Sequence, residues 1–397
     1  MGLTRRKPKH LPFFRGPYLP GCSDVMVGYL KEGLFMRMYY PTDIPLDTQD
    51  DSSILFNYNA WTTWIPDSSY LKGLAKVLMI FPFLIRLVFW WCDINLLPAI
   101  YGAKAKTEQK LKCVIMSHGL GAHRNFYTNT FCELASRGFL VVSVEHRDNS
   151  AGNTYYYKSK EDVRNDNRAI IDHLNIPLGK DHYRRRNEQV HYRSEECSKV
   201  LDLLVNLNKG EIPYNILDDL PTNTGMLFKL ADFEGKLDLD NITMMGHSFG
   251  GATALLTLSR RPEFKCGVLL DPWMFCIKDE DLHLKIKQPL QFINTQTFHL
   301  KSNVKVMEKF IGKNDTQMCT ILHTTHEFQT DTVLLIGSWL NWFMRKLDPE
   351  EALIINNCII MKFLHEHVGL PENVDEMEDL LKMNKRNIEY GLTKPWA

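Results

Sequence analysis

The sequence predicts an α/β fold, a doubly wound and mostly parallel sheet with helices on both faces. Short apolar runs typical of buried strands alternate along the chain with longer amphipathic stretches typical of helices. The clearest case is residues 112–144, where apolar runs at 112–117 and 139–144 enclose a helical stretch at 127–137. A strand, a helix and a strand in this order form the βαβ unit of a parallel sheet.

The remaining elements continue this alternation. Apolar runs predict strands at 242–245, 266–270, 290–293 and 318–322, and amphipathic stretches predict helices at 194–207 and 332–343. Nearer the N-terminus, side chains alternate in character between Met26 and Pro41, which predicts strands at an edge of the sheet.

The length and composition fit one large domain. Of the 397 residues, 44% are hydrophobic, which is enough for an extensive buried core. Residues 1–16 are predicted to be a loose N-terminal tail and residues 17–397 a single domain. Within that domain, an apolar segment at 70–92 and a charged, irregular insertion at about 150–240 interrupt the alternation.

Composition narrows the range of partners. Lys and Arg number 47 and Asp and Glu also number 47, so a formal net charge of 0 gives no reason to expect nucleic-acid binding. The nine cysteines are scattered and include no C-x-x-C pair, which argues against a zinc site and a disulfide framework. Free thiols in this number favour a reducing compartment. The sequence gives no sign of a metal, a cofactor or an obligatory protein partner.

The N-terminus predicts a cytoplasmic protein in peripheral contact with membranes. It is basic, but no long apolar run follows, so no signal peptide is expected. Gly2 invites an acylation motif, yet Arg6 stands where that motif requires Ser or Thr.

The motif Gly246-His247-Ser248-Phe249-Gly250 has the G-x-S-x-G form of a nucleophile elbow. A predicted strand precedes it and a predicted helix follows it, as such an elbow requires. The motif predicts that Ser248 sits on a sharp turn as the nucleophile of an esterase. A serine hydroxyl becomes reactive only beside a base and an oxyanion site, and these need candidates of their own.

Candidates for the acid and the base follow later strands. In α/β-hydrolases the order along the chain is Ser, then Asp or Glu, then His. Asp271 directly follows the run at 266–270 and is the predicted acid. The alternative is that Asp271 only caps a turn. Asp279 and Asp281 are rival candidates for the acid, but they lie in a polar stretch. His323 and His326 both follow the last strand, and His326 is favoured because it lies further out on the loop; His299 is a weaker candidate.

The oxyanion site is predicted from a glycine-rich loop. Residues 117–122, Ser-His-Gly-Leu-Gly-Ala, follow an early strand, where the second oxyanion donor is expected. The candidate donors are the backbone N–H groups of Leu120 and Phe249. Gly119 and Gly121 would let the substrate come close to the backbone.

Together these motifs resemble a known family. Residues 117–122, 134–139, 144–148 and 246–251 are similar to those of the platelet-activating-factor acetylhydrolases, which comprise a secreted lipoprotein-associated enzyme and an intracellular relative. The resemblance runs from about Gly16 to Leu370 and is closer to the intracellular branch, because no signal peptide is expected.

The resemblance implies an α/β-hydrolase fold and a calcium-independent phospholipase A2. Such an enzyme removes acetyl, short or oxidised acyl groups from the sn-2 position of platelet-activating factor and related phospholipids. The phospholipid substrate would be met at a membrane or lipid-aggregate surface.

The resemblance also assigns roles to residues. Ser248, Asp271 and His326 match the family's nucleophile, acid and base, and this match favours His326 over His323. Leu120 and Phe249 match the oxyanion donors, and Trp273 matches an aromatic residue that lines the acyl pocket. Glu327 departs from the pattern, since the secreted member has a neutral amide there.

The apolar segment at 70–92 is predicted to lie on a lipid surface. A membrane-spanning helix needs about 20 apolar residues, and here Pro82 and Arg86 interrupt the run. Phe89, Trp90 and Trp91 are the expected lipid-facing residues, and a buried core helix is the alternative. Two other functions stay open, a general carboxylesterase or lipase and an inactive lipid-binding protein of the same fold.

Overall fold

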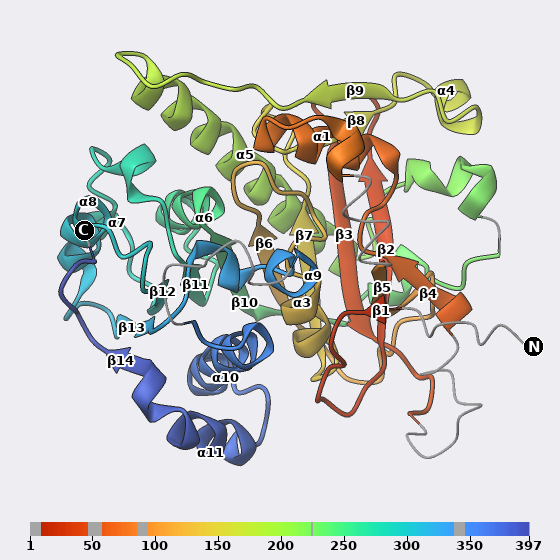
Figure 1. The fold of residues 1–397 in the computed structure, drawn as a ribbon. Coiled ribbons are helices and arrows are strands. Elements are labelled where there is room, and N and C mark those ends of the chain that lie inside the picture. The colour runs from red at the N-terminus through yellow and green to blue at the C-terminus, as the bar shows by residue number, and fades with distance from the viewer. Residues whose placement is uncertain (1–8, 47–57, 86–93, 224, 337–345, 397) are drawn as a thin grey trace, which may run out of the picture.

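The fold centres on one large sheet, shown in Figure 1. The computed structural model describes residues 9–46, 58–85, 94–223, 225–336 and 346–396. In these residues twelve strands pair in the order β1-β5-β2-β3-β7-β6-β10-β11-β12-β13-β14, with β4 beside β5. Their bounds are β1 (Lys9–His10), β2 (Pro20–Val27), β3 (Leu34–Pro41), β4 (Trp61–Thr63), β5 (Ile94–Tyr101), β6 (Leu111–Ser117), β7 (Phe139–Val144), β10 (Leu237–His247), β11 (Cys266–Leu270), β12 (Leu290–Thr295), β13 (Gln317–Ile321) and β14 (Ile388–Tyr390).

The centre of the sheet is parallel, as predicted. Strands β7, β6, β10, β11, β12 and β13 pair in parallel, so their carboxyl ends lie along one edge. The prediction that residues 26–41 form edge strands is wrong, because β3 pairs antiparallel with β2 on one side and with β7 on the other. All eight residues of β3 are buried. Alternation along this strand therefore reflects two different buried environments and not one solvent-exposed face.

Two apolar layers enclose the sheet. In β6, Cys113 and Ile115 face the layer that contains α5 (His182–Asn208) and α6 (Phe249–Arg260). Val114 and Met116, the alternate residues of the same strand, face the layer of α3 (Thr128–Ala135) and α10 (Pro349–Val368). Successive side chains of a strand point to opposite faces, so an unbroken apolar run is what a strand between two helical layers requires.

The remaining elements lie around these layers. They are α1 (Ser68–Leu78), β8 (Asn153–Tyr156), α4 (Lys160–Arg164), β9 (Ala169–Asp172), α7 (Leu282–Lys285), α8 (Lys301–Met307), α9 (Thr332–Ile336) and α11 (Asp375–Met383). The stretch 150–240 contains the β8–β9 hairpin, α4 and the 27-residue helix α5, whose Val200, Leu201 and Leu204 pack in the apolar core.

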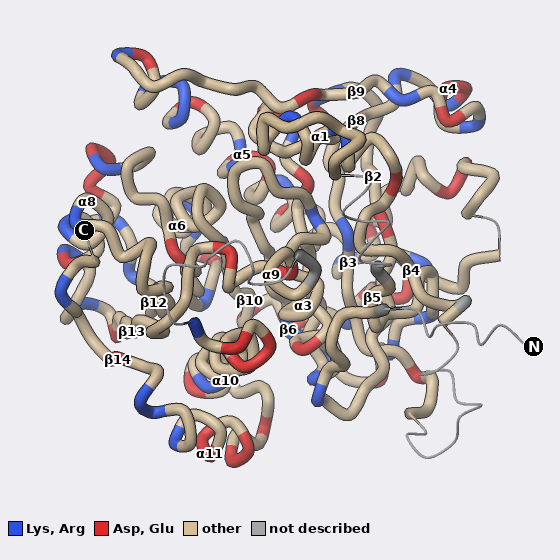
Figure 2. The backbone as a smooth tube through the Cα atoms, in the orientation of Figure 1, with Lys and Arg blue, Asp and Glu red and all other residues tan. Residues whose placement is uncertain are grey.

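Charged residues are mixed along the chain. Figure 2 shows Lys and Arg interspersed with Asp and Glu over the described backbone, so the zero net charge arises from local mixing. The eight cysteines within the described residues are buried and free. None of the helices described here combines the length and the apolar character needed to cross a bilayer.

A buried charge cluster ties β2 and β3 to the loop that precedes α3. Asp24 accepts two hydrogen bonds from Arg37, at 2.7 and 2.8 Å, and two from Arg124, both at 2.9 Å. Burial alone would raise the pKa of Asp24, but the guanidinium groups of Arg124 and Arg37 outweigh it and hold that pKa well below its usual range. The ionised carboxylate is therefore the form that the fold stabilises.

This cluster predicts acid sensitivity. Because the pKa of Asp24 is lower in the folded state, its contribution to stability is present above the unfolded pKa of about 4 and is lost as the pH falls from about 5 towards 2. At neutral pH, Asp24→Asn should lower the free energy of unfolding by about 3–5 kcal/mol, because the buried Arg37 loses its counter-charge and the buried Arg124 keeps only its pair with Glu145. Urea unfolding at a series of pH values measures both effects.

The exposed pair of Asp379 with Lys382 supplies the control. Asp379→Asn should leave the unfolding curves nearly unchanged. A wild-type protein as stable at pH 3 as at pH 6 would contradict the account of Asp24.

Candidate active site

Ser248 occupies a strained turn between β10 and α6. Its backbone angles are φ 56° and ψ −116°, a conformation that non-glycine residues rarely adopt. The Ser248 N–H donates to the carbonyl of Leu270 at 2.8 Å, and the Trp273 N–H donates to the carbonyl of Ser248 at 2.9 Å. These two bonds fix the turn against the end of β11.

The flanking glycines are required by backbone contacts. A Cβ on Gly246 would lie 2.1 Å from the carbonyl oxygen of Gly250. A Cβ on Gly250 would lie 2.0 Å from the carbonyl oxygen of Ser117, at the end of β6. Neither position has room for a side chain, so the G-x-S-x-G spacing follows from how closely α6 approaches β10 and β6.

The structure brings together the three residues predicted to act on the substrate. His326 Nε2 lies 2.9 Å from Ser248 Oγ, and His326 Nδ1 lies 2.9 Å from Asp271 Oδ2. An ionised carboxylate can only accept, so Nδ1–H donates to Asp271. In the neutral ring Nε2 is then the acceptor for the Ser248 hydroxyl, which is the tautomer a general base needs.

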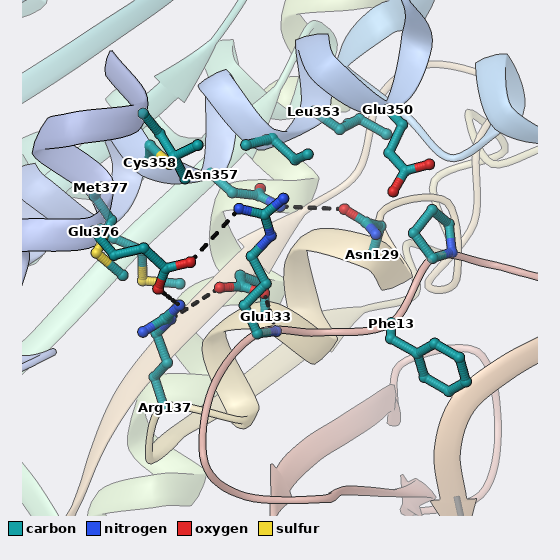
Figure 3. A pocket seen from close by; sticks show the side chains of 15 residues that line it. Phe13, Asn129, Glu133, Arg137, Glu350, Leu353, Asn357, Cys358, Glu376 and Met377 are labelled. Atoms are coloured by element: carbon teal, nitrogen blue, oxygen red, sulfur yellow. Dashed lines mark hydrogen bonds and ion pairs between the residues drawn. The ribbon is translucent and has the colours of Figure 1, made fainter. Parts of the chain in front are cut away.

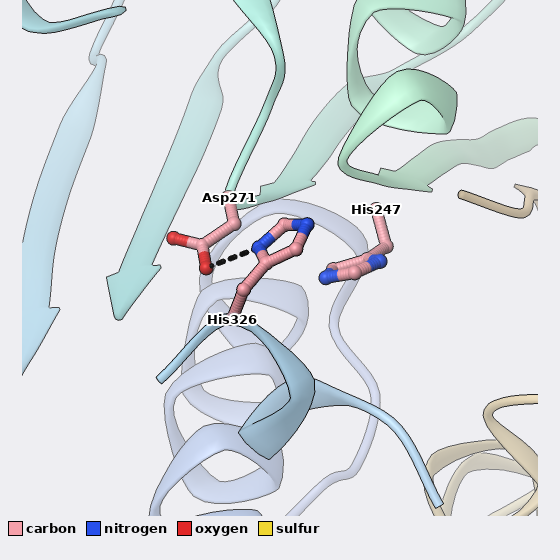
Figure 4. Close-up of side chains that lie close together, drawn as sticks. All are labelled: His247, Asp271 and His326. Carbon is pink, nitrogen blue, oxygen red and sulfur yellow. Dashed lines mark hydrogen bonds and ion pairs between the residues drawn. The ribbon is translucent and has the colours of Figure 1, made fainter. Parts of the chain in front are cut away.

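Asp271 is buried and held by the neighbouring strand. Oδ1 accepts from the backbone N–H of Thr295 at 2.7 Å, and Oδ2 accepts from the Thr295 hydroxyl as well as from His326. The carboxylate therefore has several donors and points at His326, as Figure 4 shows. Thr295 ends β12, so the acid is oriented by the adjacent strand.

A second histidine lies against the first. The His247 ring stacks on His326 with 4.5 Å between ring centroids (Figure 4), and the Phe298 ring stacks on His326 at 3.8 Å. Burial first, and then the charge of His326, hold the pKa of His247 well below its ordinary value. His247 therefore stays neutral while His326 accepts a proton. His247 was predicted only as part of the motif, and Phe298 was not predicted, because no sequence signal marks it.

His247, Asp271 and His326 are also close enough to consider as a metal site, because their ligand atoms lie within 4.8 Å of one another. Both carboxylate oxygens of Asp271, however, already accept hydrogen bonds from Thr295 or His326. This donor set fits proton transfer along a hydrogen-bonded chain better than it fits cation binding.

The predicted oxyanion loop lies beside the elbow. A Cβ on Gly119 would lie 3.4 Å from Ser248 Cβ, which places this glycine against the nucleophile. The Gly119 N–H donates to the Tyr127 hydroxyl at 2.9 Å, and that hydroxyl is 2.9 Å from His247 Nδ1. Within the described part of the chain, the N–H groups of Leu120 and Phe249 have no hydrogen-bond acceptor. Both are free to donate to a substrate.

The other predicted residues are placed as follows. Trp273 is half-buried beside the elbow, with its ring 5.8 Å from that of Phe249. Glu327 is exposed on the 3-10 turn His326–Gln329. The rivals Asp279, Asp281, His299 and His323 make no hydrogen bond or ion pair with Ser248 among the described contacts. Gly2, Phe89, Trp90 and Trp91 lie outside the described residues.

A separate small cavity lies between α3, α10 and α11 (Figure 3). Its volume is about 30 Å³, room for only one or two water molecules. Glu376 bridges Arg15 and Arg137 at its rim, at 3.6 and 3.7 Å, and Arg137 also pairs with Glu133 at 2.8 Å. These pairs join the N-terminal segment and α11 to α3, and the cavity is too small for a phospholipid.

Comparison with known proteins places the chain in a family. The family model described as "Platelet-activating factor acetylhydrolase, isoform II" matches residues 3–388. The chain belongs to the platelet-activating-factor acetylhydrolase family. It is 34% identical over 386 residues to the platelet-activating factor acetylhydrolase of Bos taurus, covering 96% of this chain and 82% of that protein.

Other relatives agree with this assignment. The Gallus gallus platelet-activating factor acetylhydrolase is 34% identical over 398 residues, covering 97% of this chain and 90% of its own. A putative phospholipase A2 of Schizosaccharomyces pombe is 24% identical, with 96% of both chains covered. A solved ferulic acid esterase from Streptomyces cinnamoneus superposes with a TM-score of 0.58 at 16% identity, covering 90% of this chain and 93% of that one, and supports the α/β-hydrolase fold.

The elbow glycines give a direct test of this geometry. Gly250→Ala forces the backbone of α6 away from Ser117, so we expect a loss of about 1–3 kcal/mol of stability and little or no labelling of Ser248 by a fluorophosphonate probe. Thermal unfolding and probe labelling of the folded protein measure the two effects. Ser259→Ala, which changes only a hydroxyl on the same helix, is the control. Full labelling of Gly250→Ala would show that the close contact is not needed.

Proposed function

We propose that this protein hydrolyses the sn-2 acetyl, short or oxidised acyl ester of platelet-activating factor and related phospholipids. The observation that carries the proposal is the continuous hydrogen-bonded chain from Ser248 through His326 to Asp271, in a member of this family. Ser248 is the nucleophile, His326 the general base and Asp271 the residue that orients the base.

Acylation begins with the Ser248 hydroxyl. Oγ attacks the sn-2 carbonyl carbon while its proton passes to His326 Nε2, 2.9 Å away. The carbonyl oxygen becomes an oxyanion and accepts hydrogen bonds from the free N–H groups of Leu120 and Phe249. One such donor contributes about 3 kcal/mol to transition-state stabilisation. Asp271 stabilises the imidazolium that forms.

Acylation ends when His326 gives its proton to the sn-2 oxygen, the ester C–O bond breaks and the lysophospholipid leaves. Deacylation then uses the same groups again. A water molecule then attacks the acyl-enzyme carbonyl while His326 takes one of its protons. Collapse of the second tetrahedral intermediate returns that proton to Ser248 Oγ and releases the carboxylic acid. Because His247 is held neutral, His326 alone carries the proton in both halves.

We also infer that the apolar segment after α1 contacts the lipid surface. Residues 78–84, here termed the apolar ridge, are exposed to solvent, with Met79 at 80%, Phe81 at 71% and Phe83 at 63% of their full accessibility. Isolated exposed apolar residues are common, but a contiguous group of them marks an interaction surface. A Cβ on Gly121 would lie 2.6 Å from Val77 Cγ1, so α1 borders the oxyanion loop and the ridge adjoins the proposed site.

A cytoplasmic location with peripheral membrane contact completes the proposal. Eight free, buried cysteines suit a reducing compartment, and burial raises the pKa of thiols such as Cys22 to about 12, which keeps them unreactive.

The catalytic assignment predicts the behaviour of three variants. Ser248→Ala and His326→Ala should each lower kcat on an sn-2 acetyl phospholipid by about 10⁴-fold or more, with little change in thermal stability. His323→Ala is the matched control and should keep most of its activity. Hydrolysis of a panel of phospholipids with acetyl, short, oxidised and long sn-2 chains measures both rate and substrate preference.

The outcomes separate the competing functions. Equal rates on long and short chains would indicate a general lipase. No hydrolysis and no fluorophosphonate labelling of the wild type would indicate a lipid-binding protein. Near-normal turnover by Ser248→Ala would remove Ser248 from the mechanism.

The lipid-surface assignment is tested with vesicles. Phe81→Glu and Phe83→Glu place charge on the apolar ridge, so we expect co-sedimentation with phosphatidylcholine vesicles to fall several-fold. Activity on a soluble ester should stay near the wild-type value. Met383→Glu, at an equally exposed apolar residue that ends α11, is the control. If vesicle binding survives in both ridge variants, the lipid surface lies elsewhere.

A further inference from the structure

One buried arginine contacts both segments that carry the proposed oxyanion donors. Arg193 lies on α5 and is inaccessible to solvent. Its Nη1 donates to the carbonyl oxygen of His118 at 2.5 Å, two residues before Leu120. Its guanidinium carbon lies 4.6 Å from the ring centroid of Phe249, within the range of a cation–π contact.

The guanidinium is itself held in place. Arg193 Nε lies 3.1 Å from Asp148 Oδ2 and 2.8 Å from the hydroxyl of Ser150. The carbonyl of Ser150 accepts the N–H of Gly121 at 2.8 Å. The oxyanion loop is therefore held on both sides of Leu120, at His118 by Arg193 and at Gly121 by Ser150.

We propose that Arg193 is a positioning residue for the oxyanion hole, which fixes the Leu120 N–H relative to the Phe249 N–H. The proposal rests on the function proposed for these two donors. Gly119 and Gly121 leave the loop backbone free to move, and an oxyanion donor must keep its geometry to within a fraction of an ångström to be effective. The loop and the elbow follow different strands, and Arg193 touches both.

The chemistry of the side chain fits this role. A guanidinium offers donors on separate nitrogens and a flat face that stacks on a ring, so it can bind Asp148, His118 and Phe249 at once. A lysine ammonium is a single point charge on a flexible stem. It could replace the ion pair with Asp148, but not also the bond to the His118 carbonyl and the stacking on Phe249.

Arg37 provides the comparison inside the same protein. It is also a buried arginine paired with an aspartate, since it forms two hydrogen bonds to Asp24. Among the described residues it makes no hydrogen bond with 117–122 or with 246–251. Arg37→Lys therefore makes the same chemical change as Arg193→Lys and carries a similar risk to folding. It differs because Arg37 makes no hydrogen bond with the oxyanion loop among the described residues.

The experiment compares Arg193→Lys with Arg37→Lys. The double variant Arg193→Met/Asp148→Asn removes both charges of the pair. It replaces Arg193→Lys in the comparison if Arg193→Lys does not fold. For each folded variant we would measure kcat and KM on p-nitrophenyl acetate, and the affinity of a trifluoromethyl ketone. That inhibitor forms a tetrahedral oxyanion adduct with an active serine, so its affinity depends on the oxyanion donors. The affinity of the unreacted substrate does not depend on them, because its carbonyl carries no oxyanion.

If Arg193 positions the donors, Arg193→Lys should lower kcat by about 10- to 100-fold. This decrease is no larger than the decrease in kcat that follows removal of one oxyanion donor. Its KM should change little, and the affinity for the ketone should fall by a similar factor. Arg37→Lys should keep kcat and ketone affinity per folded molecule. The double variant should behave as Arg193→Lys does.

Three results would overturn the proposal. The first is unchanged kcat and unchanged ketone affinity in a folded Arg193 variant. If Ser248→Ala were inactive in the same assay, the proposed function would stand and only the role of Arg193 would fail. An equal loss in Arg37→Lys would show a general effect of buried charge. If the wild type neither hydrolysed the ester nor bound the ketone, the proposed function itself would fail and the role of Arg193 with it.

Discussion

The backbone of Ser248 holds a positive φ that costs a non-glycine residue roughly 1–3 kcal/mol, and the surrounding strands are arranged to keep it there. The Ser248 N–H donates to the carbonyl of Leu270 at the end of β11, and the Trp273 N–H donates to the Ser248 carbonyl. The carbonyl of Ser117 leaves no space for a side chain at position 250. Parallel strands make this possible, because the carboxyl ends of β6, β10, β11 and β12 meet at one edge. The proposed nucleophile Ser248, the proposed acid Asp271 and the proposed oxyanion loop all lie at that edge.

The surroundings of the two histidines distinguish the proposed general base, His326, from its neighbour His247. His326 is half-buried, and its Nδ1 lies 2.9 Å from the Asp271 carboxylate. His247 is fully buried, touches the Tyr127 hydroxyl and is kept neutral. Stacked rings of His247 and Phe298 restrict His326 to the plane in which its two nitrogens point at Ser248 and Asp271. In the proposed mechanism, the proton therefore passes directly between Ser248 Oγ and His326 Nε2.

The oxyanion loop joins the chemistry to the surface of the molecule. On its buried side, Arg193 and Ser150 hold the backbone. On its other side, Gly121 packs against Val77 of α1, which leads into the apolar ridge. Under the proposed function, a phospholipid whose chains remain in an aggregate would present its sn-2 ester to Ser248 close to the lipid surface.

The sequence by itself determined the parallel sheet and the elbow, and it indicated Asp271 and two histidines, His323 and His326, as candidate partners of Ser248. Unbroken apolar runs require burial on both faces, and a G-x-S-x-G motif between a strand and a helix has few structural solutions, so local patterns were sufficient. The family resemblance then distinguished His326 from His323, which the pattern alone left open. The prediction that residues 26–41 lie at an edge of the sheet was wrong, because two different buried environments produce the same alternation of side chains as one exposed face. Tertiary structure alone decided which distant side chains meet: Phe298 on His326, Tyr127 on His247 and Arg193 on both oxyanion segments. These contacts join elements far apart in the chain and carry no periodicity or spacing that a single sequence could reveal.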